Sequence, residues 1–461
     1  MRVETRGRDL KKLKVLCCIV ALCFGSCKVS SDCIKADPSC NAAAAGLFYF
    51  PFVHNNAGIL QWTRLLGVAG VGTEARAVTT DSASNVYASG FTDGNLGGQI
   101  RTGTRDLFVV KYDVTGNRQW TRLLGVAAAQ TSSYSITTDV PGNLFVVGST
   151  TGALDGQSLT GTQDMFLTRY DLNGARIWTR LLGVAGVGTD ARAVTTDAAG
   201  NIYVTGFTDG NLDGQTKTGN RDLFLTKYNL SGVRMWTRLL GVAPVDTWGF
   251  GIRADRFGNI FLTGGTAGNL DGQVKTGTYD VHLIKYDASG NRQWTRLLGV
   301  AGVQTEGFGL TVDQSGNAHI SGYTDGNLGG ETLTGTRDLF LAKYDSSGVR
   351  ISTRLLGATA AATWGLAVTL DVLGNVYTTG GTTGNLAQQT KTGTWDMHVT
   401  KYNGNGTRQW TRLLGAPAVA TEGFGTEIMA DGTLYSVGYT EGDLGGETHT
   451  GTRDLFVNQY R

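Results

Sequence analysis

The hexapeptide Trp-Thr-Arg-Leu-Leu-Gly, first met at residues 62–67, returns along the chain at a constant interval of 58 residues. Its seven copies begin at Trp62, Trp120, Trp178, Trp236, Trp294, Ser352 and Trp410. Seven copies without an insertion or deletion indicate that one supersecondary unit has been multiplied and closed on itself. This period limits the possible folds more than any other feature of the chain.

Each repeat has the pattern of four short β-strands. Residues 75–81 and 85–92 are β-rich and are separated by a Ser-Ala-Ser turn. A glycine-rich segment then leads to residues 106–113, and a turn leads to residues 118–125, which contain the next hexapeptide. The 68 glycines of the 461 residues suit a fold made of turns. Four antiparallel strands, which we name a to d from axis to rim, are the unit of a β-propeller blade.

The two ends of the repeat region predict how the ring closes. The first hexapeptide precedes any complete a, b or c strand, whereas residues 422–460 provide an a, a b and a c strand with no d strand after them. We therefore expect residues 59–67 to supply the missing d strand, which leaves no open sheet edge. The prediction is an all-β protein with a single seven-bladed β-propeller over residues 55–461, closed by an N-terminal strand that joins the C-terminal blade.

Two stretches of the repeat resemble a known family. Gly-Asn-Ile-Tyr-Val-Thr-Gly-Phe-Thr at residues 200–208 and Asp-Leu-Phe-Leu-Thr-Lys-Tyr at residues 222–228 are similar to the SBBP β-propeller repeat of bacterial envelope proteins. The resemblance extends over all seven repeats, about residues 59–461. It implies a propeller fold and a location outside the cytoplasm, and it implies no reaction.

Residues 1–26 have the pattern of a secretory signal. Six Lys and Arg residues precede the apolar run from Val15 to Phe24, which is too short to span a membrane. The following Gly25-Ser26-Cys27 resembles a bacterial lipobox, although Phe24 stands where leucine is usual. The resemblance implies lipidation of Cys27, and residues 27–54 would form the tether. An ordinary secreted protein is the alternative.

These features predict an outer-membrane lipoprotein, either surface-exposed or periplasmic, whose contact with the membrane is its palmitate-type lipid anchor. Cys33 and Cys40 would follow the anchor and could close one disulfide loop or stay as exposed thiols. Without residues 1–26 the charge balance is about −2. This balance gives no electrostatic reason to expect a nucleic-acid partner.

Three positions of the repeat change together from one blade to the next. In blades 1, 3, 5 and 7, acids stand at the start of strand a and at the end of strand b, and an arginine stands at the start of strand c: Glu74/Asp93/Arg105, Asp190/Asp209/Arg221, Glu306/Asp325/Arg337 and Glu422/Glu441/Arg453. In blades 2, 4 and 6 the same positions hold Ser132/Thr151/Gln163, Trp248/Ala267/Tyr279 and Trp364/Thr383/Trp395. Antiparallel order places all three positions at one end of the blade, so an acid–Arg–acid cluster alternates with an aromatic pair.

The aromatic pairs are the candidate ligand-binding residues. Trp248 with Tyr279, and Trp364 with Trp395, could stack on a sugar ring or hold an apolar side chain of a protein partner. Packing within each blade is the simpler interpretation of the same residues. At positions that do not vary, the Asp before strand c, such as Asp106, could pair with an Arg of strand d within or between blades, with threonine hydroxyls capping loop amides.

Asp209, Asn211 and Asp213 fit the opening of a calcium loop. The counterparts in other blades do not fit, and the terminal acidic ligand is missing, so an Asx-rich turn is the preferred interpretation. We expect no metal and no cofactor.

The sequence does not predict an active site. Arg253 and Glu427 replace a strand-a threonine that the other five blades keep, but blades 4 and 7 lie nearly opposite each other, so we expect no compact acid–base pair. The predicted function is a lipid-anchored, non-catalytic binding platform for a protein or a glycan. A periplasmic assembly scaffold and a polysaccharide-acting enzyme are the alternatives.

Overall fold

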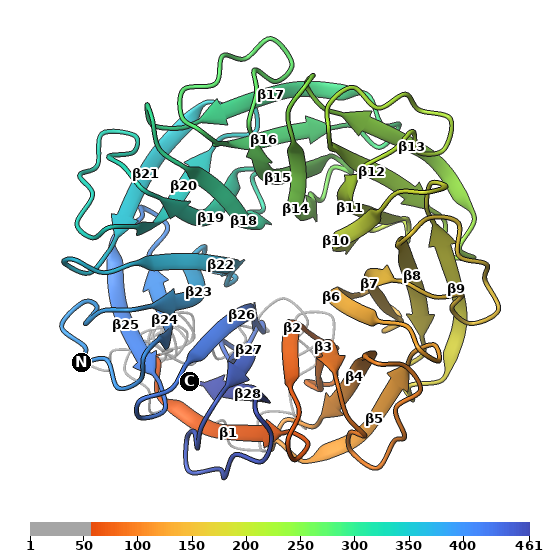
Figure 1. Cartoon of the computed structure of the whole chain (residues 1–461). Coiled ribbons are helices and arrows are strands. Elements are labelled where there is room, and N and C mark those ends of the chain that lie inside the picture. The colour runs from red at the N-terminus through yellow and green to blue at the C-terminus, as the bar shows by residue number, and fades with distance from the viewer. Residues whose placement is uncertain (1–56) are drawn as a thin grey trace, which may run out of the picture. The chain divides into compact units, whose positions relative to one another are not determined.

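The computed structural model describes residues 57–461, which form 28 β-strands in seven four-stranded antiparallel sheets arranged as a ring (Figure 1). The predicted all-β, seven-bladed architecture is therefore confirmed. Within the described part of the chain, no helix is long and apolar enough to cross a membrane. The predicted signal segment 1–26, Cys27, the tether 27–54, Cys33 and Cys40 lie outside the described residues.

Strands a surround the axis, and strands d form the rim (Figure 1). The a strands are β2 (Thr73–Thr80), β6 (Thr131–Thr138), β10 (Thr189–Thr196), β14 (Thr247–Ala254), β18 (Thr305–Val312), β22 (Thr363–Leu370) and β26 (Thr421–Ile428). The b strands are β3 (Val86–Thr92), β7 (Leu144–Thr150), β11 (Ile202–Thr208), β15 (Ile260–Thr266), β19 (Ala318–Thr324), β23 (Val376–Thr382) and β27 (Leu434–Thr440). The c strands are β4 (Asp106–Tyr112), β8 (Asp164–Tyr170), β12 (Asp222–Tyr228), β16 (Asp280–Tyr286), β20 (Asp338–Tyr344), β24 (Asp396–Tyr402) and β28 (Asp454–Tyr460). The d strands are β5 (Arg118–Leu124), β9 (Arg176–Leu182), β13 (Arg234–Leu240), β17 (Arg292–Leu298), β21 (Arg350–Leu356), β25 (Arg408–Leu414) and β1 (Leu60–Leu66).

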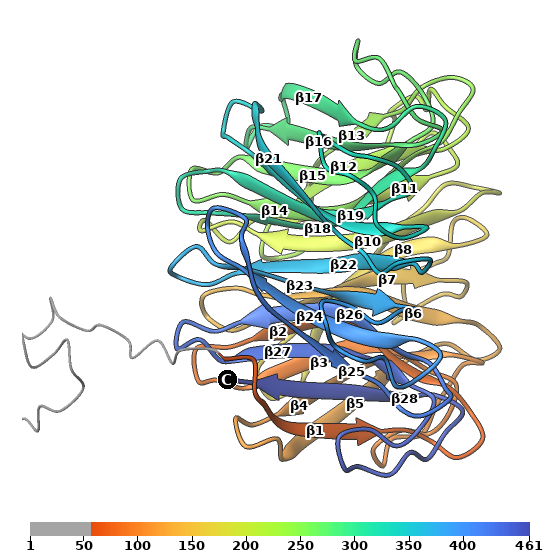
Figure 2. The ribbon, with the colours of Figure 1, turned by 90° about the vertical axis from the view of Figure 1, so that its left-hand side faces the viewer.

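The ring closes through the pairing of β1 with β28. The two strands lie side by side in both views (Figures 1 and 2), and blade 7 has the strand order β1-β28-β27-β26. Inside this sheet, the Thr63 hydroxyl donates to Oδ1 of Asn458 at 2.8 Å. The predicted closure by an N-terminal strand is confirmed.

The apolar core lies between neighbouring blades. The b and c strands are buried on both faces, so successive side chains alternate between the two interfaces of a blade. In blade 1, Val86, Phe108 and Val110 pack with residues of blade 7, whereas Leu107 and Val109 pack with residues of blade 2. Every blade therefore needs both neighbours to complete its core.

The hexapeptide ends in glycine because a larger residue would not fit at this position. Gly125 lies against the buried carboxylate of Asp106, and a Cβ at this glycine would stand 1.8 Å from Oδ1 of that carboxylate. The carboxylate accepts hydrogen bonds from the backbone N–H groups of Thr102 at 2.8 Å and Gly103 at 2.7 Å. It thereby fixes the loop that precedes strand c.

The arginine of the hexapeptide joins one blade to the next. Nε of Arg122 donates to the carbonyl oxygen of Gly174, in the c–d turn of blade 2, at 3.0 Å. The Asp–Arg pair that the sequence led us to expect is therefore wrong, because each partner binds backbone groups instead. The expected threonine caps are present: the Thr92 hydroxyl accepts the N–H of Gly94 at 3.2 Å.

Candidate functional site

One face of the propeller carries the positions that vary between blades. The strand register places Thr73 opposite Thr92 and Thr92 opposite Asp106, so the start of strand a, the end of b and the start of c lie at the same end of the blade. The hydroxyls of Thr73 and Thr92 are 2.9 Å apart and hold these ends together. We call this surface the d–a face, after the loops that join strand d to the next strand a.

Arginine and acid pair within each odd-numbered blade. Arg105 binds Asp93 through Nε at 2.7 Å and through Nη2 at 3.0 Å, and Arg337 binds Asp325 in the same two-point manner at 2.6 and 2.9 Å. Each guanidinium also lies over an aromatic ring of strand b, for example that of Tyr323, 3.6 Å from Arg337. This stacking fixes the arginines on the surface of their own blade.

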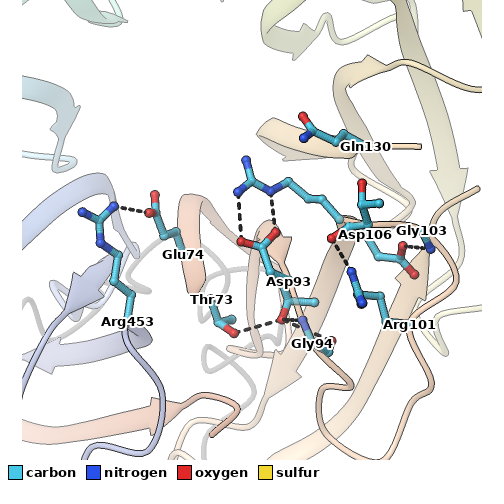
Figure 3. A network of polar contacts seen from close by, with 12 residues as sticks. Thr73, Glu74, Asp93, Gly94, Arg101, Gly103, Asp106, Gln130 and Arg453 are labelled. Atoms are coloured by element: carbon cyan, nitrogen blue, oxygen red, sulfur yellow. Dashed lines mark hydrogen bonds and ion pairs between the residues drawn. The ribbon is translucent and has the colours of Figure 1, made fainter. Parts of the chain in front are cut away.

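The acids at the start of strand a make different contacts from those expected. Glu74 accepts from Nη1 of Arg453 of blade 7 at 2.5 Å, and Figure 3 shows Arg453 pointing across to Glu74. Asp190 accepts from Gln163 of blade 2 at 3.0 Å. The predicted acid–Arg–acid cluster within one blade is therefore corrected for Glu74 and Asp190: each also binds a residue of the preceding blade, because the start of strand a faces that blade.

The aromatic pairs predicted from the sequence form. The ring centroids of Trp248 and Tyr279 are 5.3 Å apart, and those of Trp364 and Trp395 are 5.7 Å apart at right angles. Nε1 of Trp364 donates to Glu422 of blade 7 at 2.8 Å. Trp395 is 38% exposed, whereas the other three rings are half-buried.

Two further residue types accompany the aromatic pairs and were not assigned from the sequence. In blades 4 and 6, Gly265 and Gly381 replace the strand-b aromatic ring, and a Cβ at Gly381 would stand 2.6 Å from the Trp364 ring. Trp364 therefore occupies space that the missing ring leaves. In the sequence, Trp appears in strand a only in the blades where Gly appears at the paired position of strand b. This joint change could have predicted the packing.

The second type is a histidine of strand c. Nε2 of His282 lies 2.7 Å from the carbonyl oxygen of Trp248, and Nε2 of His398 lies 3.0 Å from that of Trp364. Both histidines are fully buried. Burial lowers the pKa of each imidazole to about 4, while the backbone hydrogen bond acts in the opposite direction. Each histidine thus holds the backbone that carries a tryptophan.

An axial channel opens at the centre of the d–a face. Every strand a has a register shift after its third residue, so its fourth residue has no partner on strand b. These seven half-buried side chains line one cavity of about 230 Å³, and we call them the channel-mouth ring: Arg76, Tyr134, Arg192, Phe250, Phe308, Leu366 and Phe424. The repeat pattern did not predict this bulge, because a shift shared by all seven copies leaves the period unchanged.

Arg253 and Glu427 lie farther along the same channel. Both line a cavity of about 250 Å³ with threonines of blades 1 to 3. Burial raises the pKa of the Glu427 carboxyl, and the charge of Arg253 acts against this rise. Blades 4 and 7 are opposite, as the sequence indicated, and both side chains nevertheless line this one cavity.

The three residues of the candidate calcium loop are bound to groups of the protein. Asp209 pairs with Arg221 at 2.8 Å, Asn211 accepts the N–H of Lys217 at 2.9 Å, and Asp213 pairs with Arg234. Among residues 57–461, no group of three or more His, Cys, Asp or Glu residues gathers as a metal site would require. These contacts account for the loop as a structural turn.

The fold and its repeat define a seven-bladed β-propeller whose three jointly varying positions lie at one face. The family model of SBBP, a β-propeller repeat, matches residues 61–97, 119–154, 177–213, 236–271 and 293–329. The chain therefore contains SBBP β-propeller repeats, five of which the family model matches within the seven-bladed ring.

Known proteins match this chain at low sequence identity. The chain is 24% identical to an uncharacterized WD repeat-containing protein of Acanthamoeba polyphaga mimivirus, over 84% of this chain and 31% of that protein. It is 26% identical to the regulatory protein FlaEY of Caulobacter vibrioides, over 84% of this chain and 39% of that protein. The chain thus spans about a third of the length of these relatives. A chain in the crystal structure of a mitotic checkpoint complex superposes with a TM-score of 0.50 and 11% identity, over 95% of this chain and 99% of that one, and shares the fold.

Proposed function

We propose that this propeller is a non-catalytic binding platform, and that its d–a face contacts a protein or glycan partner. The observation that carries the proposal is Trp395, a large aromatic ring that is 38% exposed and held edge-on against Trp364. An indole kept at the surface by a neighbouring ring is ready to stack on a sugar or an apolar side chain with little loss of conformational entropy. Tyr279 holds the same position in blade 4.

The test uses a variant at the exposed ring and a matched control. Immobilised protein is exposed to envelope and extracellular polysaccharides and to solubilised envelope proteins, and the dissociation constant of the best binder is measured. Trp395→Ala is expected to weaken binding about 30-fold, the effect of losing about 2 kcal/mol at an aromatic contact. Phe257→Ala removes a ring that is 61% exposed in the a–b turn, at the other end of the blade, and should bind normally. Unchanged binding by Trp395→Ala would remove the platform proposal.

We also propose that a lipid on Cys27 anchors the propeller in the outer membrane, on the cell surface or in the periplasm. The support is the basic, apolar and small-residue pattern of residues 1–27. Radiolabelled palmitate should enter the protein and be absent from Cys27→Ala. Protease applied to intact cells then distinguishes the two locations: a surface platform is digested, whereas a periplasmic scaffold is protected until the membrane is opened.

An enzyme acting on polysaccharide is the second candidate, because Glu427 is a carboxyl with a raised pKa in a polar channel. Glu427→Gln tests this candidate against polysaccharide substrates. Product formation by the native protein that is lost in folded Glu427→Gln would favour the enzyme over the platform.

A further inference from the structure

The channel-mouth ring has two chemically different halves. Blades 1 to 3 contribute Arg76, Tyr134 and Arg192, whereas blades 4 to 7 contribute four apolar side chains, Phe250, Phe308, Leu366 and Phe424. The seven positions share one backbone geometry, because each is the bulged residue of strand a. A charged arc and an apolar arc therefore face each other across one opening.

Both arginines are held in place by the protein. The Arg76 guanidinium lies 4.0 Å from the ring centre of Phe424, and that of Arg192 lies 4.2 Å from the ring centre of Tyr134. Each also pairs with the buried acid two residues earlier in its strand, Arg192 with Asp190 at 2.9 Å. Because stacking and pairing already restrict both arginine side chains, they lose little conformational entropy when a ligand binds.

The arginines retain hydrogen-bonding capacity. A guanidinium has five N–H donors. Nη2 of Arg76 binds Glu74, and Nη2 of Arg192 binds Asp190. The Nε–H groups of both are buried and have no hydrogen-bond partner among residues 57–461. Burial keeps these Nε–H groups from a ligand, but the two arginine side chains are 28% and 30% exposed and line the cavity, where their terminal N–H groups can donate to acceptor oxygens of a ligand.

From this arrangement we propose that the channel mouth binds an apolar group that carries a carboxylate. The carboxylate is held between Arg76 and Arg192, because the fork of a guanidinium matches its two oxygens. The apolar group lies against Phe250, Phe308 and Leu366. A cavity of about 230 Å³ is smaller than sites for drug-sized ligands, so it suits a group the size of one large side chain.

Two sources carry this chemistry: the C-terminal residue of a polypeptide that ends in an apolar side chain, and a free aromatic carboxylic acid. The proposal rests on the proposed function, since the mouth is at the centre of the d–a face. It uses other side chains than Trp395, so the two can fail separately.

The experiment measures binding of four probes to the purified full chain by calorimetry. The probes are 3-phenylpropionate, its uncharged amide, a hexapeptide ending in phenylalanine with a free carboxylate, and the same peptide amidated. We expect each acid to bind at least ten-fold more tightly than its amide. Tighter binding of the peptide acid than of 3-phenylpropionate identifies a polypeptide end as the ligand, and the reverse order identifies a small acid.

Variants separate the two halves of the ring. Arg192→Gln and Arg76→Gln are expected to weaken acid binding about ten-fold and to abolish the preference over the amide, while Phe308→Ala should weaken the acid and the amide alike. Arg337→Gln removes an arginine of the same face outside the cavity and should bind like the native protein. Trp395→Ala should also keep the probes even if it loses the partner. Equal binding of acid and amide, native affinity in folded Arg192→Gln, or no binding of any probe at millimolar concentration would overturn the proposal.

Discussion

Gly125→Ala gives the most direct test of how the hexapeptide stabilises a blade. The added Cβ would stand 1.8 Å from Oδ1 of Asp106 and 2.3 Å from its Cγ. Ordinary van der Waals contact begins near 3.4 Å, so the carboxylate must retreat by about 1.6 Å. Its hydrogen bonds to the N–H groups of Thr102 and Gly103, now 2.8 and 2.7 Å long, would then be lost.

The cost follows from these contacts. Hydrogen bonds to a charged group contribute about 1.5 to 3 kcal/mol each, and part of this is recovered as the loop relaxes. We therefore expect Gly125→Ala to lower the free energy of unfolding by about 3 to 5 kcal/mol. The measurement is guanidinium chloride unfolding followed by tryptophan fluorescence and circular dichroism, with agreement of the two probes as the check for a single transition.

Two controls make the test specific. Gly72→Ala places a Cβ no closer than 3.8 Å to any other group, so its unfolding free energy should stay within about 0.5 kcal/mol of the native value. In a background of Asp106→Ala, which removes the colliding carboxylate, Gly125→Ala should cost much less than it does alone. Equal costs in the two backgrounds would refute the assignment of this glycine to the carboxylate contact.

Three other predictions concern closure, the aromatic blades and pH. Deleting residues 57–66 removes β1 and exposes the edge of the last c strand, so the protein should associate into larger species. Size exclusion with light scattering measures this, and a monomer would contradict the closure argument. Gly381→Ala should lower the melting temperature, because its Cβ would stand 2.6 Å from an indole, whereas Gly265→Ala, with 3.4 Å to its nearest neighbour, should melt close to the native protein; equal shifts would contradict this. His282 and His398 have a pKa of about 4 when folded and about 6.5 when unfolded, so the unfolded chain binds more protons between these values and stability falls as the pH drops from 6.5 to 4. Each histidine adds about 1.4 kcal/mol per pH unit to this slope, and His282→Phe/His398→Phe should flatten it by about twice that amount; an unchanged slope would show that the imidazoles do not titrate in this way.

The sequence predicted the fold almost completely, because a 58-residue period with four strand-like segments reports the blade, its copy number and its closing strand directly. Contacts between blades were harder to predict. Glu74 was expected to pair with Arg105 of its own blade. It binds Arg76 of its own strand and also Arg453, which is 379 residues away along the chain and adjacent only because the ring is closed. The bulge of strand a was also missed, since identical backbone irregularities in every copy leave no trace in a comparison of the copies.

The candidate site was predicted in part for a similar reason. Positions that break the repeat identified the aromatic pairs, and the pairs form as contacts between side chains. The same comparison did not reveal that Trp364 fills the space above Gly381, because packing depends on the side chain facing a residue and not on its own variation. The exposed part of the site is therefore smaller than the sequence suggested and is concentrated at Trp395.

The pairing of β1 with β28 sets the order in which the ring can be completed during synthesis. Of the 28 strands, β1 leaves the ribosome first and its partner β28 leaves last. Blades 1 to 6 are each continuous in sequence and can form as the chain lengthens, since their strands pair with near neighbours. Blade 7 forms only when β28 is available. Until then β1 has no partner strand, and the apolar faces of blades 1 and 6 that blade 7 covers are open to other chains. The interval before closure is thus the period in which this protein is most exposed to misassembly, and a chaperone that shields the first strand would act there.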